Sequence, residues 1–304
     1  MGIVAMIIAI MLIPIDKKYQ YAFVKNACSL QSNYIYHRTF EDSTPIDIIF
    51  LGSSHTMCGI SQSTVQTRLS DLGIYSQVCN MAFCRLGRDM DYILFKDIIQ
   101  YKKPKMLILE VRQDEPELGH PDFGYMADLA DVLSAPLVVN QSYFTGLKNA
   151  YLVRMNYARD LLSHINYNSP YEAPRLNFLE KTLIADTAIL YGAARNRWQR
   201  YYSHTRPKWV EQLMTRYPKK YIQMIMDMAQ KHQIKVIMLY VPNFGYPYHR
   251  PKELLYYQQM ADVMIMPDSF YDNEKYWRED EHLNSPAALI LSDSVADFIS
   301  RRLY

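Results

Sequence analysis

Residues 46–55 read IDIIFLGSSH and contain the pattern that decides the fold. The run Ile46–Leu51 is short and apolar and ends at Gly52, which is typical of a strand buried on both faces of a parallel sheet. The segment Gly59–Leu72 has helical character, so a strand-then-helix unit begins here. Serines that directly follow such a strand lie at the carboxyl edge of the sheet, where open α/β sheets bind their ligands.

The alternation of strands and helices continues on both sides of a less regular middle region. Strands are predicted at Tyr75–Phe83, Lys105–Val111, Lys235–Pro242 and Val263–Met266, and helices at Asp89–Tyr101, Lys219–His232, Lys252–Ala261 and Ser285–Leu303. This order predicts an α/β fold of three α/β/α layers around a doubly wound, mostly parallel sheet. From Arg112 to about Arg216 the alternation is lost, so we interpret residues 113–216 as a largely helical insertion.

The N-terminal segment is the main targeting signal. Gly2–Ile15 is uncharged and apolar and stops at Asp16, Lys17 and Lys18. A complete membrane span needs about 20 residues, so this run is short. A buried core helix is the alternative, but a run without any polar face is unusual in a soluble domain. We expect residues 1–24 to be a membrane anchor or signal segment, and residues 25–304 to be one α/β domain facing the periplasm or cell exterior.

Composition excludes several classes of function. The 33 basic and 31 acidic residues are mixed along the chain, so a nucleic-acid partner is not expected. The loop GSSHTMCG lacks the P-loop lysine and the GxGxxG spacing of nucleotide binders. The four cysteines show no zinc-binding spacing, and neither a metal nor a cofactor is expected. Buried free thiols are favoured for Cys58, Cys79 and Cys84, although a disulfide among them stays open in an oxidising compartment.

Two short motifs contain the chemistry. In GSSH, Ser54 follows a strand at a helix start, where its hydroxyl is exposed and its own N–H can help to bind an oxyanion. In EDEHLNSPAA, residues 279–288, His282 lies before the last helix and follows three carboxylates. A histidine with an adjacent acid can act as a general base. Each motif alone also has an ordinary explanation. The serines could simply cap a helix, and His282 could be a solvated surface residue.

Together these motifs resemble the SGNH/GDSL hydrolases, in particular the membrane-anchored branch with the D-alanyl transfer proteins of teichoic acid synthesis and the alginate O-acetylation proteins. GSSH stands where the family has its first block, GDS, with Ser53 in place of the usual aspartate. The resemblance implies that Ser54 is the nucleophile and His282 the base. Either Glu279, which aligns with the family acid, or Asp280 could orient the imidazole.

The remaining family blocks match less well. The resemblance implies oxyanion donors at the Ser54 backbone and after the second strand, where NMAFCRLG offers Asn80 and Gly87. The third block normally supplies an asparagine, whereas this chain reads LEVRQDE. Arg112 or Gln113 could donate there instead, and a structural ion pair is the alternative for Arg112.

The resemblance implies a flavodoxin-like sheet and a serine O-acyl esterase or acyltransferase that modifies an envelope or exported polysaccharide. Its partners would be an acylated polysaccharide or acyl donor and a membrane-bound O-acyltransferase. The alternative is an inactive glycan-binding or assembly protein of the same fold. Aromatic residues interleaved with arginines in the insertion suit sugar contact and helix packing equally. They are Tyr143, Tyr151, Tyr157, Tyr167, Tyr171, Tyr191, Trp198, Tyr201, Tyr202 and Trp209, with Arg154, Arg159, Arg195, Arg197 and Arg200. We assign no function to His55 from the sequence.

Overall fold

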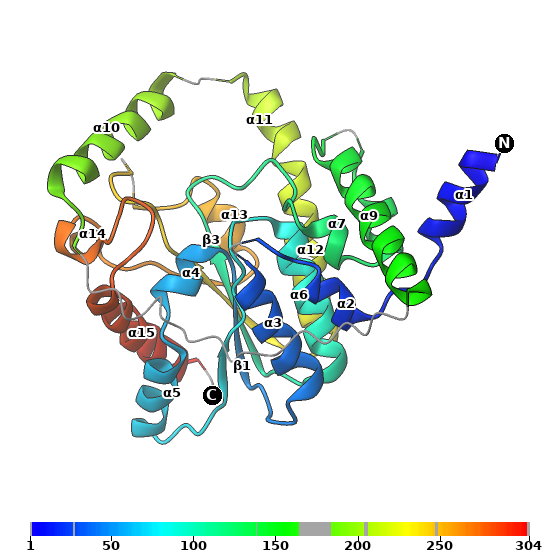
Figure 1. The fold of residues 1–304 in the computed structure, drawn as a ribbon. Coiled ribbons are helices and arrows are strands. Elements are labelled where there is room, and N and C mark those ends of the chain that lie inside the picture. Colours follow the sequence, from blue (N-terminus) through cyan, green and yellow to red (C-terminus); the bar gives the residue numbers. More distant parts are fainter. Residues whose placement is uncertain are drawn as a thin grey trace.

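The computed structural model describes residues 2–26, 28–137, 139–163, 184–203, 206–246 and 249–302. Its centre is a five-stranded sheet in the order β2-β1-β3-β4-β5, with every pair parallel (Figure 1). The strands are β1 Ile48–Leu51, β2 Val78–Asn80, β3 Met106–Val111, β4 Lys235–Tyr240 and β5 Asp262–Met264. The predicted α/β class and parallel sheet are therefore confirmed, with shorter strands than expected.

The strands are buried because their side chains are apolar on both faces of the sheet. Phe50 pairs with Ile108, and Ile108 pairs with Ile237, all three almost completely buried. One apolar cluster packs α3, α6 and α12 on one face, and a second packs α5 and α15 on the other (Figure 1). The helices are α3 Ser29–Tyr36, α6 Arg88–Tyr101, α12 Arg216–Lys231, α5 Gln62–Asp71 and α15 Ser285–Ser300. Helices on both faces are compatible with the expected three layers.

Among the described residues between β3 and α12, the regular secondary structure is helical. Its helices are α7 Phe123–Met126, α8 Leu129–Ser134, α9 Tyr143–Leu162, α10 Thr187–Ser203 and α11 Lys208–Met214. After β4, α13 Leu254–Gln258 and α14 Asp268–Tyr271 flank the edge strand β5.

The polar stretch Lys25–Pro45 contains the helix α3. In α3 the buried Gln31 donates to the Asn80 carbonyl at 3.2 Å, and the buried Ser32 donates to the Tyr21 carbonyl at 2.7 Å. These bonds allow polar side chains to face the interior. Tertiary partners, which composition does not show, therefore produce this helix.

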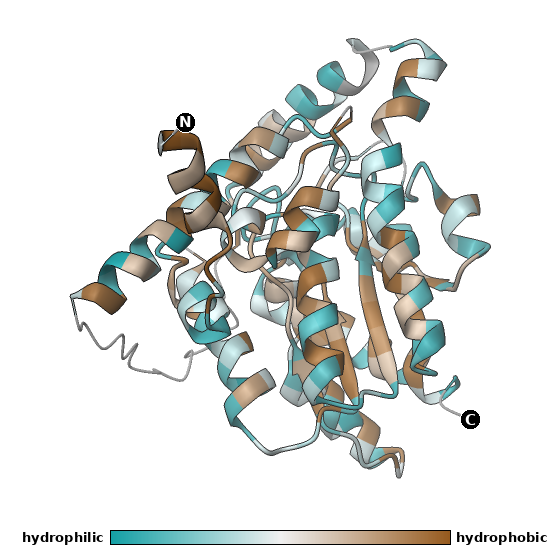
Figure 2. Cartoon of the chain, turned by 90° about the vertical axis from the view of Figure 1, so that its right-hand side faces the viewer, coloured by the Kyte–Doolittle hydropathy of each residue, from teal (hydrophilic) through white to brown (hydrophobic). Residues whose placement is uncertain are grey.

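The N-terminal segment forms α1 Gly2–Met11 and α2 Lys17–Ala22, separated by Pro14 and capped at α2 by Asp16. α1 is hydrophobic along its whole length and projects from the sheet domain beside α9 (Figures 1 and 2). Across the described ranges, none of the helices is both long and apolar enough to span a membrane.

Candidate active site

The loop after β1 places Ser54 at the start of a helix. The chain passes very close to β3 at Gly52, where a Cβ would lie 2.4 Å from the Cβ of Glu110. Only glycine fits this approach. The next residue, Ser53, caps α4 Ser54–Gly59 by accepting a hydrogen bond from the His55 N–H at 3.2 Å. Ser54 therefore occupies the first helical position, as the sequence predicts.

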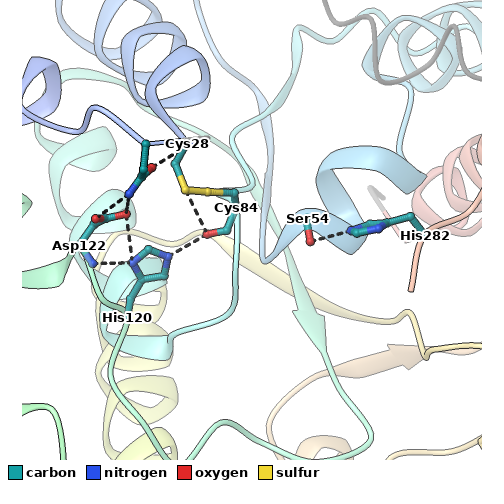
Figure 3. The surroundings of a disulfide bond; sticks show 7 residues. Cys28, Ser54, Cys84, His120, Asp122 and His282 are labelled. Atoms are coloured by element: carbon teal, nitrogen blue, oxygen red, sulfur yellow. Dashed lines mark hydrogen bonds and ion pairs between the residues drawn. A yellow bond between two sulfur atoms is a disulfide. The ribbon is translucent and has the colours of Figure 1, made fainter. Parts of the chain in front are cut away.

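A short hairpin presents His282 to this serine. Trp277 and Leu283 form an antiparallel bridge, and the Asn284 amide donates to the Lys275 carbonyl at 2.6 Å. The Ser54 Oγ lies 2.8 Å from the His282 Nε2 (Figure 3). The two motifs are 228 residues apart in sequence and meet within hydrogen-bonding distance.

The opposite ring nitrogen of His282, Nδ1, forms a short hydrogen bond with the Glu279 carboxylate. Arg278 also donates to Glu279, at 2.9 Å. Partial burial acts to raise the pKa of Glu279, but the hydrogen bonds from Arg278 and His282 outweigh it and lower the pKa below its ordinary value. The carboxylate therefore stays ionised near neutral pH.

The other candidate acid, Asp280, has a different partner. Its carboxylate accepts a hydrogen bond from Arg197 Nη2 of α10 at 2.5 Å, and its carbonyl accepts one from the Phe244 N–H at 2.8 Å. The sequence left Glu279 and Asp280 as alternatives because one residue separates them. The structure brings Glu279, and not Asp280, to His282.

Glu110, at the end of β3, is a site residue that the sequence analysis missed. It is completely buried and accepts hydrogen bonds from the Ser53 N–H at 2.9 Å and hydroxyl at 2.8 Å. It also accepts from the Thr56 N–H at 3.1 Å and hydroxyl at 2.6 Å. This carboxylate thus fixes the serine loop and the first turn of α4. The sequence signal for this residue was a single acid within the apolar run MLILEV.

Arg112 and Gln113, the two side chains predicted to replace a family asparagine, follow the end of β3. Arg112 lies 3.3 Å from both Glu110 and the Ser53 hydroxyl, and donates to Asn243 at 2.7 Å. Gln113 accepts a hydrogen bond from the Tyr240 hydroxyl at 2.8 Å. Gln113 therefore contacts the end of β4, and the ion-pair alternative describes Arg112.

The predicted oxyanion donors differ in their surroundings. The Asn80 side chain donates to the carbonyls of Thr56 and Ile60, at 3.0 and 2.9 Å, and so holds α4 in place. Gly87 precedes α6 and packs against His120, whose Cβ would lie 2.5 Å from a Cβ at this position. The third predicted donor, the Ser54 N–H, has no hydrogen-bond partner among the described residues.

The cysteines differ from the sequence prediction. Cys28 and Cys84 form a disulfide, with Cα atoms 5.5 Å apart, so the expectation of free thiols is wrong for Cys84 (Figure 3). Cys58 and Cys79 are buried and lie outside this disulfide. The sequence separation of 56 residues conceals the pair that folding brings together. Within the described ranges there is no group of His, Cys, Asp and Glu side chains that could hold a metal ion.

The described aromatic residues of the insertion differ in their surroundings. Tyr157 packs edge-on against Tyr19, with ring centroids 4.9 Å apart. Tyr191, Trp198 and Trp209 are exposed. Tyr167, Tyr171 and the side chains of Tyr201 and Tyr202 lie outside the described part of the chain.

Comparison with known proteins gives no match. No family model, no curated protein and no solved structure matches this chain.

Proposed function

We propose that this chain is a serine O-acyl esterase or acyltransferase of the SGNH type, with Ser54 as nucleophile, His282 as base and Glu279 as the orienting acid. One observation carries the proposal: the Ser54 Oγ lies 2.8 Å from His282 Nε2, while Nδ1 of the same ring bonds to Glu279. A nucleophile, a base and an acid joined in this order are the working parts of serine acyl transfer.

The geometry supports a two-step reaction. His282 Nε2 takes the proton of Ser54 as the hydroxyl attacks the ester carbonyl, and Glu279 stabilises the imidazolium that forms. His282 then gives the proton to the leaving alcohol, so that an acyl-enzyme remains. A second alcohol or water attacks this ester in the reverse sense. The N–H of Ser54, at the first position of α4, supports oxyanion binding because it is not used within the helix.

The proposed substrate is an envelope or exported polysaccharide, and the proposed partner is a membrane-bound O-acyltransferase. This part follows the family resemblance. The Cys28–Cys84 disulfide supports an oxidising compartment, because such bonds are rare in the cytosol. The exposed apolar helix α1 supports attachment at a membrane surface.

The decisive experiment is labelling of the purified full-length chain with a fluorophosphonate serine probe. Wild type should label, and Ser54→Ala and His282→Ala should not. Glu279→Gln should slow labelling by about 100-fold or more, since loss of the orienting acid costs up to about 10⁴ in related triads. Glu281→Gln, an exposed neighbour of His282, is the matched control and should label like wild type.

A folded wild-type chain that does not label would overturn the catalytic proposal. The inactive glycan-binding alternative would then gain support from the exposed side chains of Tyr191, Trp198 and Trp209 in the insertion. Retention of the chain on immobilised polysaccharide, and its loss in a variant with these three residues changed to alanine, would test that alternative.

A further inference from the structure

A cavity of about 280 Å³ lies where the insertion packs against the sheet domain. Its walls come from the start of α6, the loop before α7, the end of α8, the first turn of α9 and the start of α12 (Figure 1). This volume is near the lower end of small-molecule sites, which span about 300–1,000 Å³. Ser54, His282 and Glu279 do not line it, so the cavity is separate from the proposed catalytic site.

Apolar side chains form much of the cavity wall. They are Leu118, Pro121, Phe123, Val132 and Ala135. Phe123 and Val132 are buried and belong to the apolar cluster on that face of the sheet, so packing fixes this wall. At about 30 Å³ for each water-sized group, the cavity holds roughly nine such groups. A molecule that fills it is therefore small and mainly apolar.

Asn140, just before α9, lines the cavity and has an unused donor. Its side-chain oxygen accepts a hydrogen bond from the Ser142 N–H at 2.9 Å, which fixes the orientation of the amide. The NH₂ group, Nδ2, donates to no group among the described residues. Asn140 is only 6% exposed, and Nδ2 retains part of that surface. Buried donors are normally paired, so this one points to a ligand oxygen in the cavity.

The start of α9 adds a second donor to the same wall. No side chain caps this 20-residue helix. The N–H of Thr145, another residue of the cavity lining, has no acceptor in the described part of the chain. Unpaired N–H groups at the start of a helix carry a partial positive charge. An oxygen acceptor beside Asn140 is therefore favoured by the helix as well.

The charges around the cavity favour an uncharged ligand. Among the described residues that line it, Asp89 is the one carboxylate, and there is no lysine or arginine. Burial raises the pKa of Asp89 to about 6, so it is ionised at pH 7.5, and burial lowers the pKa of the His120 imidazole, which stays neutral there. An anion would meet the charge of Asp89 without a counter-ion. A cation would leave the donors of Asn140 and α9 without an acceptor.

We propose that this cavity binds a neutral aliphatic carbonyl compound, such as an acyl ester or amide, whose carbonyl oxygen accepts a hydrogen bond from Asn140 Nδ2. The oxygen supplies the acceptor that the donors lack, and the aliphatic chain covers the apolar wall. The carbonyl group brings this acceptor without a net charge. The inference does not depend on the serine mechanism, because the two sites share none of the residues named for catalysis.

Calorimetric titration of the full-length chain with 2-heptanone at pH 7.5 tests the ligand class. This ketone has the carbonyl group and the chain, and a serine hydrolase does not cleave it. One molecule should bind per chain, with a dissociation constant of about 1 mM or below, as expected for eight non-hydrogen atoms. Heptanoate and heptylammonium, which carry a charge on a chain of the same length, should bind at least about tenfold more weakly.

Three variants test the location. Asn140→Asp keeps an oxygen for the Ser142 N–H and lacks the Nδ2 donor, so the affinity for 2-heptanone should fall by about three- to tenfold, the value of one neutral hydrogen bond. Gln141→Glu adds the same charge at the exposed neighbouring residue and should bind like wild type. Ala135→Leu, which fills part of the cavity, should abolish binding. Thermal unfolding of each variant confirms that it is folded.

Four results would overturn the inference. They are no binding of 2-heptanone to the folded wild type, equal affinity in Asn140→Asp, undiminished binding in folded Ala135→Leu, and tighter binding of heptanoate or heptylammonium than of the ketone. The first three would show that the cavity is not the site, and the fourth that its ligand is charged. Labelling of Ser54 by the fluorophosphonate probe should be the same in all three variants, so failure of either proposal leaves the other intact.

Discussion

At the scale of single residues, one buried carboxylate holds the serine loop in place. Glu110 is fully buried and receives its hydrogen bonds from the backbone and side chains of Ser53 and Thr56. Arg112 lies 3.3 Å away as the compensating charge. A charge in this position is stable only while its donors and its counter-ion remain in place.

Glu110→Gln should therefore lower both stability and activity. The amide presents an N–H₂ group to donors that need an acceptor, and leaves Arg112 without its partner charge. We expect a loss of about 3 kcal/mol in the free energy of unfolding, measured by urea denaturation, because a buried ion pair is broken. Labelling of Ser54 should slow as well. Glu117→Gln, which removes one charge of a part-exposed ion pair with Arg206, is the control. It should lower the free energy of unfolding by less than about 1 kcal/mol. Equal stability of the two variants would contradict this account.

Asp89, at the start of α6, predicts a pH dependence of stability. It is buried, and burial raises its pKa from 3.8 to about 6 despite hydrogen bonds from the His120 N–H and the Tyr217 hydroxyl. Between pH 4 and pH 6 the native state therefore binds a proton that the unfolded chain has released. Stability should fall as pH rises through this window, by about 2 kcal/mol for this group.

Urea unfolding at pH 4.5 and pH 6.5 measures this effect. In Asp89→Asn the decrease should be smaller than in wild type, because the titrating group is gone. The Tyr217 hydroxyl, which donates to Asp89, can rotate to accept from the new amide. Identical pH slopes in the two proteins would rule out Asp89 as the source. Asp91, whose pKa burial raises to about 7, contributes in the same direction and leaves a residual slope.

At the scale of elements, α10 braces the loop that carries His282. Arg197 donates to the Phe244 carbonyl and to the Asp280 carboxylate, each at 2.5 Å. A Cβ on Gly245 would lie 2.3 Å from the Cβ of Ala194, so the two segments pack closely. A helix from the insertion therefore helps to fix the position of the proposed base.

Arg197→Ala should reduce the rate of Ser54 labelling by about 10- to 100-fold, since a small displacement of the base is enough for a loss of that size. Asp280→Asn should have a smaller effect in the same direction, and the double variant should lose less than the product of the two. Arg195→Ala, an exposed arginine on the same helix, is the control. Recovery of the labelling rate in Arg197→Lys, with an unchanged KM for an ester substrate, would distinguish positioning of His282 from general destabilisation. Strictly multiplicative effects would show that the Arg197–Asp280 pair does not act as a unit.

At the scale of the whole molecule, one disulfide connects the chain before α3 to the loop after β2. The Cys28–Cys84 disulfide joins the start of α3 to the loop after β2 (Figure 3). The Cys84 carbonyl accepts a hydrogen bond from His120 Nε2 at 2.8 Å, so that loop is also tied to the chain after β3. The loop that precedes α6 therefore depends on contacts from three parts of the sequence.

Replacing both Cys28 and Cys84 by serine should lower the free energy of unfolding by about 4 kcal/mol, as expected for closure of a loop of this length. Thermal unfolding with and without dithiothreitol measures the effect. The reductant should lower the midpoint of the wild type and leave the double variant unchanged. A wild-type midpoint that is insensitive to reduction would show that the bond does not stabilise the fold.

The sequence by itself determined the α/β class, the five strands and the two motifs that meet in the site. Apolar runs of strand length are buried wherever they fold, and the carboxyl ends of parallel strands share one edge, so Ser54 could be placed before any contact was known. The sequence also placed His282 on a loop before the last helix, where the structure has it.

Only the tertiary structure showed which of Glu279 and Asp280 contacts His282, identified Glu110, paired Cys28 with Cys84 and tied the Asn80 side chain to α4. Each of these depends on partners far apart in sequence, such as Arg197 for Asp280. A hydrogen bond or ion pair depends on distances of a few tenths of an ångström, which local periodicity does not encode. Pattern therefore indicated the strands and the helices that alternate with them, and packing fixed which polar groups these elements bring together.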